Sequence, residues 1–239
     1  MSDLFYNLGK KAGPFVRRTK WVWKSVTGSE TDAILLEHDV GHDMARKIRE
    51  RLDPEPAATQ LLSEVGAKLS DCVANKLRTF SFESIKSSEP NAFALPGGFI
   101  FVTRPLVELC KWNKDEIAFI LAHEMSHVIR GHVMERIISS SAINAGSRVT
   151  PIRGLITGWL RTAGVKFLES AYSRDLELEA DKLATRLIVA AGYDPQAPVS
   201  LLARLAQLSR PEEQFDLGKY FSSHPEFKIR IDNVKGLSK

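Results

Sequence analysis

The sequence is poor in cysteine, with Cys72 and Cys110 as the only two among 239 residues. They lack the Cys-x-x-Cys spacing of thiolate metal sites, and two cysteines are too few for a disulfide framework. We therefore expect two free thiols packed among apolar residues. Such cysteine usage is consistent with a reducing compartment.

Long apolar runs are also missing. A secretory signal requires about 7–15 continuous apolar residues after a positive start, and residues 1–30 contain no such run. A membrane-spanning helix requires about 20 apolar residues. Residues 137–168 are the most apolar stretch of the chain after residue 131. They are interrupted by four basic residues: Arg148, Arg153, Arg161 and Lys166. We expect neither an export signal nor a transmembrane segment, and hence a cytoplasmic or peripherally membrane-associated protein.

The chain has little excess charge of either sign, since 33 basic residues face 29 acidic ones. We therefore expect no nucleic-acid partner. The N-terminal arm, residues 1–30, differs because it is basic and rich in aromatic residues. It is compatible with peripheral contact with an anionic membrane, or with aromatic rings that fold onto the domain. The rest, residues 31–239, has the composition of one globular domain.

Apolar periodicity predicts a mainly helical domain with a small sheet. Two runs, 91–95 and 99–102, flank Pro96-Gly97-Gly98 and predict a hairpin, and residues 80–85 predict a further strand. Residues 141–164 are rich in Gly, Ser, Thr and Pro and predict an irregular excursion. Helices are expected over residues 32–51, 57–77, 113–131, 165–190, 196–208 and 226–236.

The most informative motif lies within the expected helix 113–131, where His123, Glu124 and His127 form a His-Glu-x-x-His pattern. Residues four apart on a helix share a face, so both imidazoles can bind one ion. The carboxylate of Glu124 is then placed to act as a general base toward water. The motif predicts a catalytic zinc site, with one Zn²⁺ per chain.

A catalytic zinc ion generally has three protein ligands, so two histidines leave the site one ligand short. Glu177 and Asp181 lie four apart on one face of an otherwise apolar helix. A carboxylate that faces a core requires a cation or hydrogen-bond donors. We predict that Glu177 binds the metal, that Asp181 accepts a hydrogen bond from the ring of His123, and that Glu179 points elsewhere. The alternative, a solvated acidic face, is disfavoured by the upstream motif.

Four motifs in this order resemble the gluzincin metallopeptidases of peptidase family 48, with the soluble Oma-like branch as the nearest match. The resemblance is dense over residues 80–232 and looser over residues 32–79. The motifs are Asn-Ala-Phe-Ala-Leu-Pro-Gly-Gly at 91–98, His-Glu-x-x-His at 123–127, Glu-x-Glu-Ala-Asp at 177–181 with Tyr-Ser-Arg at 172–174 before it, and Ser-His-Pro at 223–225 with Arg230.

The resemblance implies the gluzincin fold, an α+β and mainly helical domain with a small mixed β-sheet beside the active-site helix. It implies the same roles for Glu177 and Asp181 as the residue pattern does. It further implies that His224 stabilises the oxyanion, with Arg230 as its orienting or structural partner. The family's active-site edge strand, which pairs with an extended peptide substrate, corresponds to Asn91, Ala92, Phe93 and Ala94. A plain core hairpin is the alternative for this stretch, and both interpretations can hold.

Two other histidine patterns are weaker. His38 and His42 are also four apart, but no third acidic ligand is evident nearby, and Gly41 weakens the helix between them. We interpret them as a surface face. His132 lies five residues after His127, hence on another face of a continued helix, which favours a helix-end residue or a residue that supports a ligand over a ligand itself.

The sequence thus predicts a zinc-dependent endopeptidase that hydrolyses protein or peptide substrates, with protein quality control as its role. The alternative is a non-catalytic, zinc-bearing chaperone or scaffold that binds extended peptides without cutting them. Glu124 argues against that alternative, because a purely structural zinc site has no use for a general base.

Overall fold

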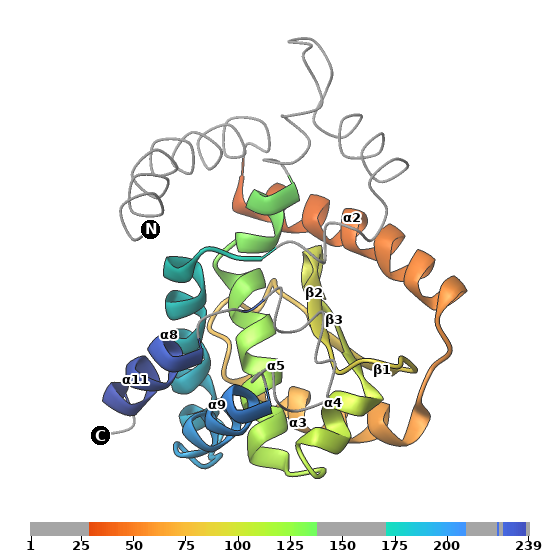
Figure 1. Cartoon of the computed structure of the whole chain (residues 1–239). Coiled ribbons are helices and arrows are strands. Elements are labelled where there is room, and N and C mark those ends of the chain that lie inside the picture. Colours follow the sequence, from red (N-terminus) through yellow and green to blue (C-terminus); the bar gives the residue numbers. More distant parts are fainter. Residues whose placement is uncertain (1–28, 138–170, 209–223, 225–226, 238–239) are drawn as a thin grey trace, which may run out of the picture.

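The computed structural model describes residues 29–137, 171–208, 224 and 227–237. These residues form a mainly helical domain with one small sheet, which confirms the expected α+β class (Figure 1). With the labels of Figure 1, the elements in chain order are α2 (Glu30–Arg51), α3 (Pro56–Asp71), β1 (Ser81–Ile85), β2 (Ala92–Leu95), the 3-10 turn η1 (Pro96–Gly98), β3 (Phe99–Thr103), α4 (Arg104–Leu109), α5 (Lys114–Ile129), α8 (Arg174–Ala190), α9 (Ala197–Leu208) and α11 (Phe227–Leu237).

Helix α2 begins at Glu30, two residues earlier than predicted, because a capping box fixes its start. The Ser29 side chain accepts a hydrogen bond from the Asp32 N–H at 3.1 Å, and the Asp32 carboxylate accepts one from the Ser29 N–H at 3.3 Å. Of the arm expected at residues 1–30, only Ser29 and Glu30 fall within the described residues.

Helix α3 ends at Asp71, although its apolar pattern predicted a helix to residue 77. Beyond it the chain turns toward α2 and forms polar contacts there. Asn75 donates a hydrogen bond to the carboxylate of Glu30 at 2.8 Å, and Arg78 donates one to Glu37 at 2.7 Å. These contacts between residues distant in sequence outweigh the weak local preference for helix.

The three strands form one mixed sheet in the order β1-β3-β2. Strands β2 and β3 are the predicted antiparallel hairpin, and β1 runs parallel to β3. Gly97 and Gly98 in the connecting turn have φ of 72° and 91°, a region that favours glycine. Among the described residues β2 has a hydrogen-bonded neighbour on one side, so it is an edge strand.

Helix α2 lies directly on the hairpin turn, and Gly41 makes this approach possible. A Cβ atom at Gly41 would lie 1.7 Å from the carbonyl oxygen of Pro96 and 2.9 Å from the ring of Phe99. His38 and His42 flank this contact, with ring centroids 5.2 and 6.3 Å from that of Phe99. Both histidines are exposed, in agreement with the predicted surface face.

Helix α5 is buried along almost its whole length. The Asn113 side chain accepts hydrogen bonds from two first-turn N–H groups at 2.8 and 3.1 Å, so it caps the helix that was expected over residues 113–131. The helix ends at Ile129, and Gly131, with φ of 77°, redirects the chain before residues 132–137 become helical again. Polar residues on this buried helix therefore require partners from other elements.

The helix expected from residue 165 was placed too early at its start. Residues 171–173 are not helical, α8 begins at Arg174, and the preceding residues, including the excursion at 141–164, lie outside the described part. Tyr172 is buried just before α8, at 6% exposure. The predicted end is confirmed, since Gly192 with φ of 78° follows the helix. Helix α8 packs along α5, and α11 packs on α8 and α9 (Figure 1).

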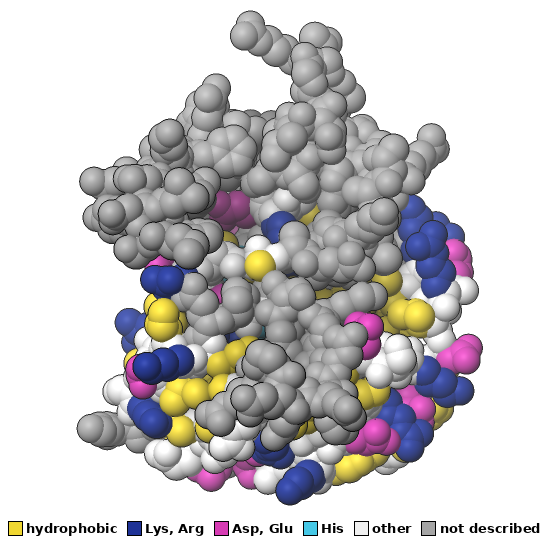
Figure 2. All heavy atoms as spheres, viewed as in Figure 1, with side chains coloured by type: hydrophobic (Ala, Val, Ile, Leu, Met, Phe, Trp, Pro, Cys, Tyr) yellow, Lys and Arg dark blue, Asp and Glu magenta, His cyan; other side chains and the backbone are white. Residues whose placement is uncertain are grey.

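Within the described ranges, every helix is too short or too polar to span a membrane. Both cysteines are free, and Cys110 is fully buried, which raises the pKa of its thiol. On the face shown in Figure 2, basic and acidic side chains are mixed along the described surface.

Candidate metal centre

Helix α5 places His123 and His127 side by side in the interior. The two side chains are 1% and 0% exposed, and their Nε2 atoms lie 3.2 Å apart. Their rings are one turn apart on the same helix face, as the four-residue spacing requires.

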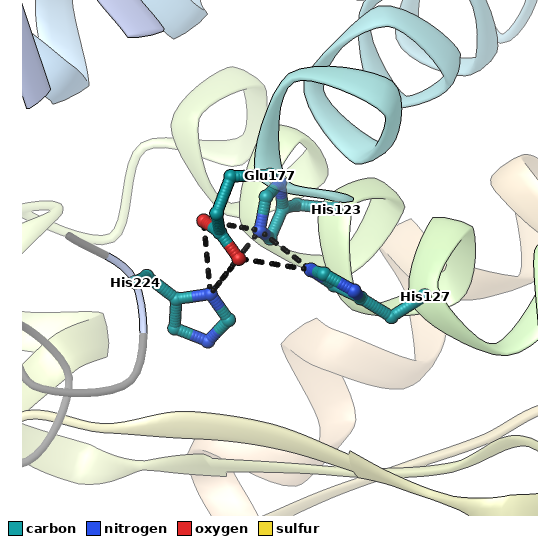
Figure 3. A group of neighbouring side chains, drawn as sticks. All are labelled: His123, His127, Glu177 and His224. Atoms are coloured by element: carbon teal, nitrogen blue, oxygen red, sulfur yellow. Dashed lines mark hydrogen bonds and ion pairs between the residues drawn. The ribbon is translucent and has the colours of Figure 1, made fainter. Parts of the chain in front are cut away.

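Helix α8 brings Glu177 to this pair. Its Oε1 lies 3.3 Å from Nε2 of His127, and its Oε2 lies 3.5 Å from Nε2 of His123. Figure 3 shows the carboxylate pointing between the two imidazoles. The contact depends on the packing of α8 along α5, which joins residues about 50 positions apart in sequence.

His224 completes a group of four. Its Nδ1 lies 3.1 Å from Oε1 of Glu177 and 3.3 Å from Nε2 of His123 (Figure 3). One ligand atom from each of these four residues lies within 4.8 Å of the others. The structure therefore brings together the three predicted metal ligands and the residue to which the resemblance gave a catalytic role.

The geometry and chemistry of this group fit a zinc ion. Ligand atoms at bond lengths of about 2.0–2.1 Å in a tetrahedral site are about 3.3–3.4 Å apart. The distances from His123 and His127 to one another and to Glu177, 3.2, 3.3 and 3.5 Å, match this separation. Two imidazoles and one carboxylate are also a donor set that zinc accepts. Metal binding by these residues remains a prediction.

Glu124 is the polar residue of the motif that lacks a strong partner. Its side chain is 1% exposed, and its Oε1 has no hydrogen-bond partner among the described residues. Nε2 of His224 lies 3.5 Å from this oxygen. A buried carboxylate oxygen without a partner is expected where a reacting group is to be accommodated.

Burial and neighbouring charges set the protonation states. Burial lowers the pKa of His127 well below its usual range, which leaves a neutral imidazole. Burial opposes ionisation of Glu177, but the charges of His224, Arg230 and His123 hold its pKa well below the usual value. Burial and Arg230 oppose protonation of His123, yet Glu177 and Asp181 outweigh them and raise the pKa of His123 to about 9.

The structure places Asp181 against the ring of His123. Its Oδ1 is 2.9 Å from Nδ1 of His123, on the side of the ring opposite to Nε2. Arg230 from α11 donates to both Asp181 oxygens, from Nε at 2.9 Å and from Nη2 at 2.8 Å. It also lies 3.0 Å from Glu177 and donates to the backbone carbonyl of His224 at 3.5 Å. The guanidinium of Arg230 is thus centred on the two carboxylates rather than on the His224 ring.

The predicted substrate strand is β2, the edge strand, with Asn91 just before it. Ala92, Phe93 and Ala94 are buried, and the rings of Phe93 and Phe101 stack at a centroid distance of 5.5 Å. The strand packs against α5, so it lies beside the metal group while its outer edge is unpaired within the described residues. Core packing and substrate pairing are compatible here, and the pairing remains a prediction.

Sequence reasoning missed the contact of His127 with Tyr172, and it allowed His132 a ligand-supporting role without naming the ligand that His132 contacts. The Tyr172 ring stacks on the His127 ring at a centroid distance of 3.8 Å and an interplanar angle of 17°. His132 lies behind His127, with 3.1 Å between the two Nδ1 atoms. Helical periodicity could not predict the second contact, because α5 ends before His132 and Gly131 turns the chain back. The positive-φ preference of glycine was the available signal.

A buried pair of histidines four apart on one helix, joined by a glutamate from a second helix, is a metallopeptidase-type centre on a mainly helical α+β domain. The family model of Peptidase family M48 matches residues 56–238, and the chain belongs to this family.

Known proteins of similar sequence carry peptidase names. The mitochondrial metalloendopeptidase OMA1 of Schizosaccharomyces pombe is 30% identical over 158 residues, which cover 63% of this chain and 44% of the relative. The beta-barrel assembly-enhancing protease of Escherichia coli O157:H7 is 29% identical over 220 residues, which cover 85% of this chain and 42% of the relative. The chain thus spans less than half the length of either relative. The crystal structure of S. mikatae Ste24p matches with a TM-score of 0.45 and 19% identity, over 98% of this chain and 65% of that chain.

Proposed function

We propose that this chain is a zinc-dependent metalloendopeptidase that hydrolyses peptide bonds with an activated water molecule. One observation carries the proposal: Nε2 of His123, Nε2 of His127 and the carboxylate of Glu177 lie 3.2–3.5 Å apart in the interior, with the buried carboxylate of Glu124 on the same helix. Membership of the peptidase family supports it.

In this proposal His123, His127 and Glu177 hold one zinc ion. A zinc ion in such a site supplies Lewis acidity, which polarises a carbonyl group and lowers the pKa of a water molecule. Glu124 takes a proton from the attacking water and delivers it to the leaving amine. Its buried Oε1, which lacks a hydrogen-bond partner among the described residues, suits that role because no competing donor occupies it.

Three further residues support the reaction. His224 donates a hydrogen bond to the oxyanion of the tetrahedral intermediate, consistent with its position between Glu177 and Glu124, at 3.1 and 3.5 Å. Asp181 accepts the Nδ1 hydrogen of His123, which leaves Nε2 free to bind metal. Arg230 neutralises part of the charge of Asp181 and Glu177.

The proposed substrate is an extended protein segment. Its backbone pairs with the open edge of β2 at Asn91–Ala94, which lies beside α5. We assign the enzyme to protein quality control, because one similar protein is named for β-barrel assembly and another is a mitochondrial metalloendopeptidase. Peripheral membrane contact through residues 1–30 is part of the proposal, and sedimentation with anionic and neutral vesicles, with and without these residues, tests it.

Metal analysis combined with a proteolysis assay tests the function. The purified chain is expected to contain about one zinc per molecule and to cleave unfolded casein, to lose cleavage with a chelator, and to regain it on addition of zinc. Cleavage that is insensitive to chelator would contradict the metal mechanism. The cleavage products must also be internal fragments, because an endopeptidase does not act from the chain ends.

A non-catalytic, zinc-bearing peptide-binding protein is the second candidate, and the position of His224 favours it. Four candidate ligand atoms lie within 4.8 Å, so His224 can close the fourth position as in structural zinc sites. A chain that binds zinc and extended peptides but releases no fragments would establish this second function. If the parent releases no fragments but the His224→Ala variant does, His224 instead blocks an active centre.

A further inference from the structure

The two histidine ligands of the proposed zinc site are supported differently. His123 faces the charged carboxylate of Asp181 through its Nδ1 at 2.9 Å. His127 faces a second imidazole, that of His132, across 3.1 Å between Nδ1 atoms. His132 is 1% exposed, so it is a buried polar side chain next to the cluster.

The requirement for a free lone pair on the metal-binding nitrogen determines which of the two rings donates the hydrogen in this contact. Nε2 of His127 is the atom that faces His123 and Glu177, so its lone pair must be free for metal binding and the ring hydrogen resides on Nδ1. His127 therefore donates and His132 accepts. A neutral His132 that accepts at Nδ1 carries its hydrogen on Nε2, which lies 3.6 Å from Oε2 of Glu179. Arg130 holds the other oxygen of Glu179, with Nε at 3.2 Å.

These contacts connect the buried ligand His127, through His132, to the partly exposed carboxylate of Glu179. Glu179 has a side-chain exposure of 44%, so its charge stays hydrated while its field reaches the cluster through the neutral ring of His132. A carboxylate in the place of His132 would add a further buried anion beside His127, in a cluster that already holds Glu177. An imidazole holds the hydrogen of His127 without that desolvation penalty.

The ring plane of His127 is fixed independently. Tyr172 stacks on the imidazole face at 3.8 Å, and the guanidinium of Arg136 lies 4.2 Å from the centroid of the Tyr172 ring. Stacking opposes rotation of the His127 ring about its Cβ–Cγ bond but allows the ring to slide within its plane. The hydrogen bond to His132 opposes that sliding, so the two contacts together define where Nε2 points.

We propose that His132 is a positioning residue for His127: it fixes the tautomer and the orientation of this ligand through the chain His127–His132–Glu179. The inference rests on the proposed function, since it concerns a ligand of the proposed zinc. It assigns a supporting role to Glu179, which the sequence predicted to point away from the site. It also assigns a role to Gly131, whose φ of 77° turns His132 back toward α5.

Zinc affinity, measured by competition with a chelating dye, tests the proposal without any activity assay. His132→Leu removes the acceptor and is expected to weaken zinc binding by about 10–100-fold. His132→Asn restores an acceptor at the Nδ1 position and is expected to recover most of the affinity, which a purely space-filling role would not require. His42→Leu makes the same chemical change on the surface of α2 and serves as the matched control. Thermal unfolding of each metal-free variant shows whether it is folded.

Nitrogen-15 spectra of the histidines in the zinc-loaded parent supply an independent measurement. His127 must carry a slowly exchanging hydrogen on Nδ1, and His132 must be the Nε2–H tautomer. A hydrogen on Nδ1 of His132 would overturn the proposal even if His132→Leu failed to fold. So would a folded His132→Leu variant that binds zinc as tightly as the parent. A parent that binds no zinc refutes the proposed function, and this inference with it. If the parent binds zinc, the affinity of His132→Leu and the tautomer of His132 test this inference separately from the proposed function.

Discussion

Arg230 donates to both carboxylate oxygens of Asp181, from Nε at 2.9 Å and from Nη2 at 2.8 Å, and both side chains are at most 1% exposed. Such a buried bidentate pair is strong only while it is complete, because removal of one partner leaves an uncompensated charge in the interior. It joins α11 to α8 directly behind His123, so the C-terminal helix supports the metal group through this pair.

Arg230→Met is therefore expected to destabilise the metal-free domain by about 3–5 kcal/mol, since it removes the buried guanidinium that pairs with the carboxylates of Asp181 and Glu177. Denaturant unfolding of metal-free protein measures this change. Lys228→Met, on the exposed side of the same helix, is the control and should change stability by less than about 0.5 kcal/mol. Equal stabilities of the two variants would show that the pair contributes little.

Asp181→Asn tests the support of His123 by a carboxylate. The amide oxygen can still accept a hydrogen bond, but the charge that favours donation from Nδ1 is lost, so zinc affinity is expected to fall by about 10–100-fold. Chelator competition measures it. Asp175→Asn, at an exposed position in the first turn of α8, should leave zinc affinity unchanged. A comparable loss in both variants would point to a general charge effect instead of a specific contact.

Glu124→Gln tests the general base. The amide cannot accept the proton of water, so kcat is expected to fall by roughly 10²–10⁴-fold or more, whereas His123, His127 and Glu177 are untouched and zinc should stay bound. The readouts are casein cleavage and zinc content of the same preparation. Cleavage at the parent rate by a zinc-loaded Glu124→Gln protein would exclude Glu124 as the base.

His224→Ala separates a catalytic role from a purely structural one. If His224 stabilises the oxyanion, kcat is expected to fall by roughly 10²–10³-fold with KM and zinc content nearly unchanged. Steady-state kinetics on a fluorogenic peptide, together with metal analysis, measure both quantities. Loss of zinc from His224→Ala would assign His224 to the ligand set and remove it from the oxyanion role.

Gly41→Ala tests the close contact between α2 and the hairpin turn. The added methyl group would lie 1.7 Å from the Pro96 carbonyl oxygen, so α2 must move, and the free energy of unfolding is expected to fall by at least about 1–3 kcal/mol. Gly236→Ala, in α11 with no atom within 4 Å of the added carbon, is the control and should be neutral or slightly stabilising. A Gly41→Ala protein as stable as the parent would show that α2 moves away from the turn at little free-energy cost.

Local patterns predicted the elements well where a short segment decides its own structure. The hairpin follows from two apolar runs around Pro96-Gly97-Gly98, and α5 follows from the Asn113 cap and a glycine after its end. Two helix boundaries were predicted wrongly because contacts with residues distant in sequence override the local pattern. Helix α3 ends at Asp71, since Asn75 and Arg78 bond to α2. Helix α8 begins only after Tyr172, whose ring is packed on His127.

The sequence by itself determined that His123 and His127 share a helix face and that Glu177 and Asp181 share another, because a spacing of four residues is a property of the helix alone. Only the tertiary structure decided which faces meet: the packing of α8 and α11 around α5 joins Glu177 to the imidazoles and Arg230 to Asp181. It also decided that His132 returns to His127 after the turn at Gly131. Contacts of this kind depend on the relative placement of whole elements, which no local periodicity encodes.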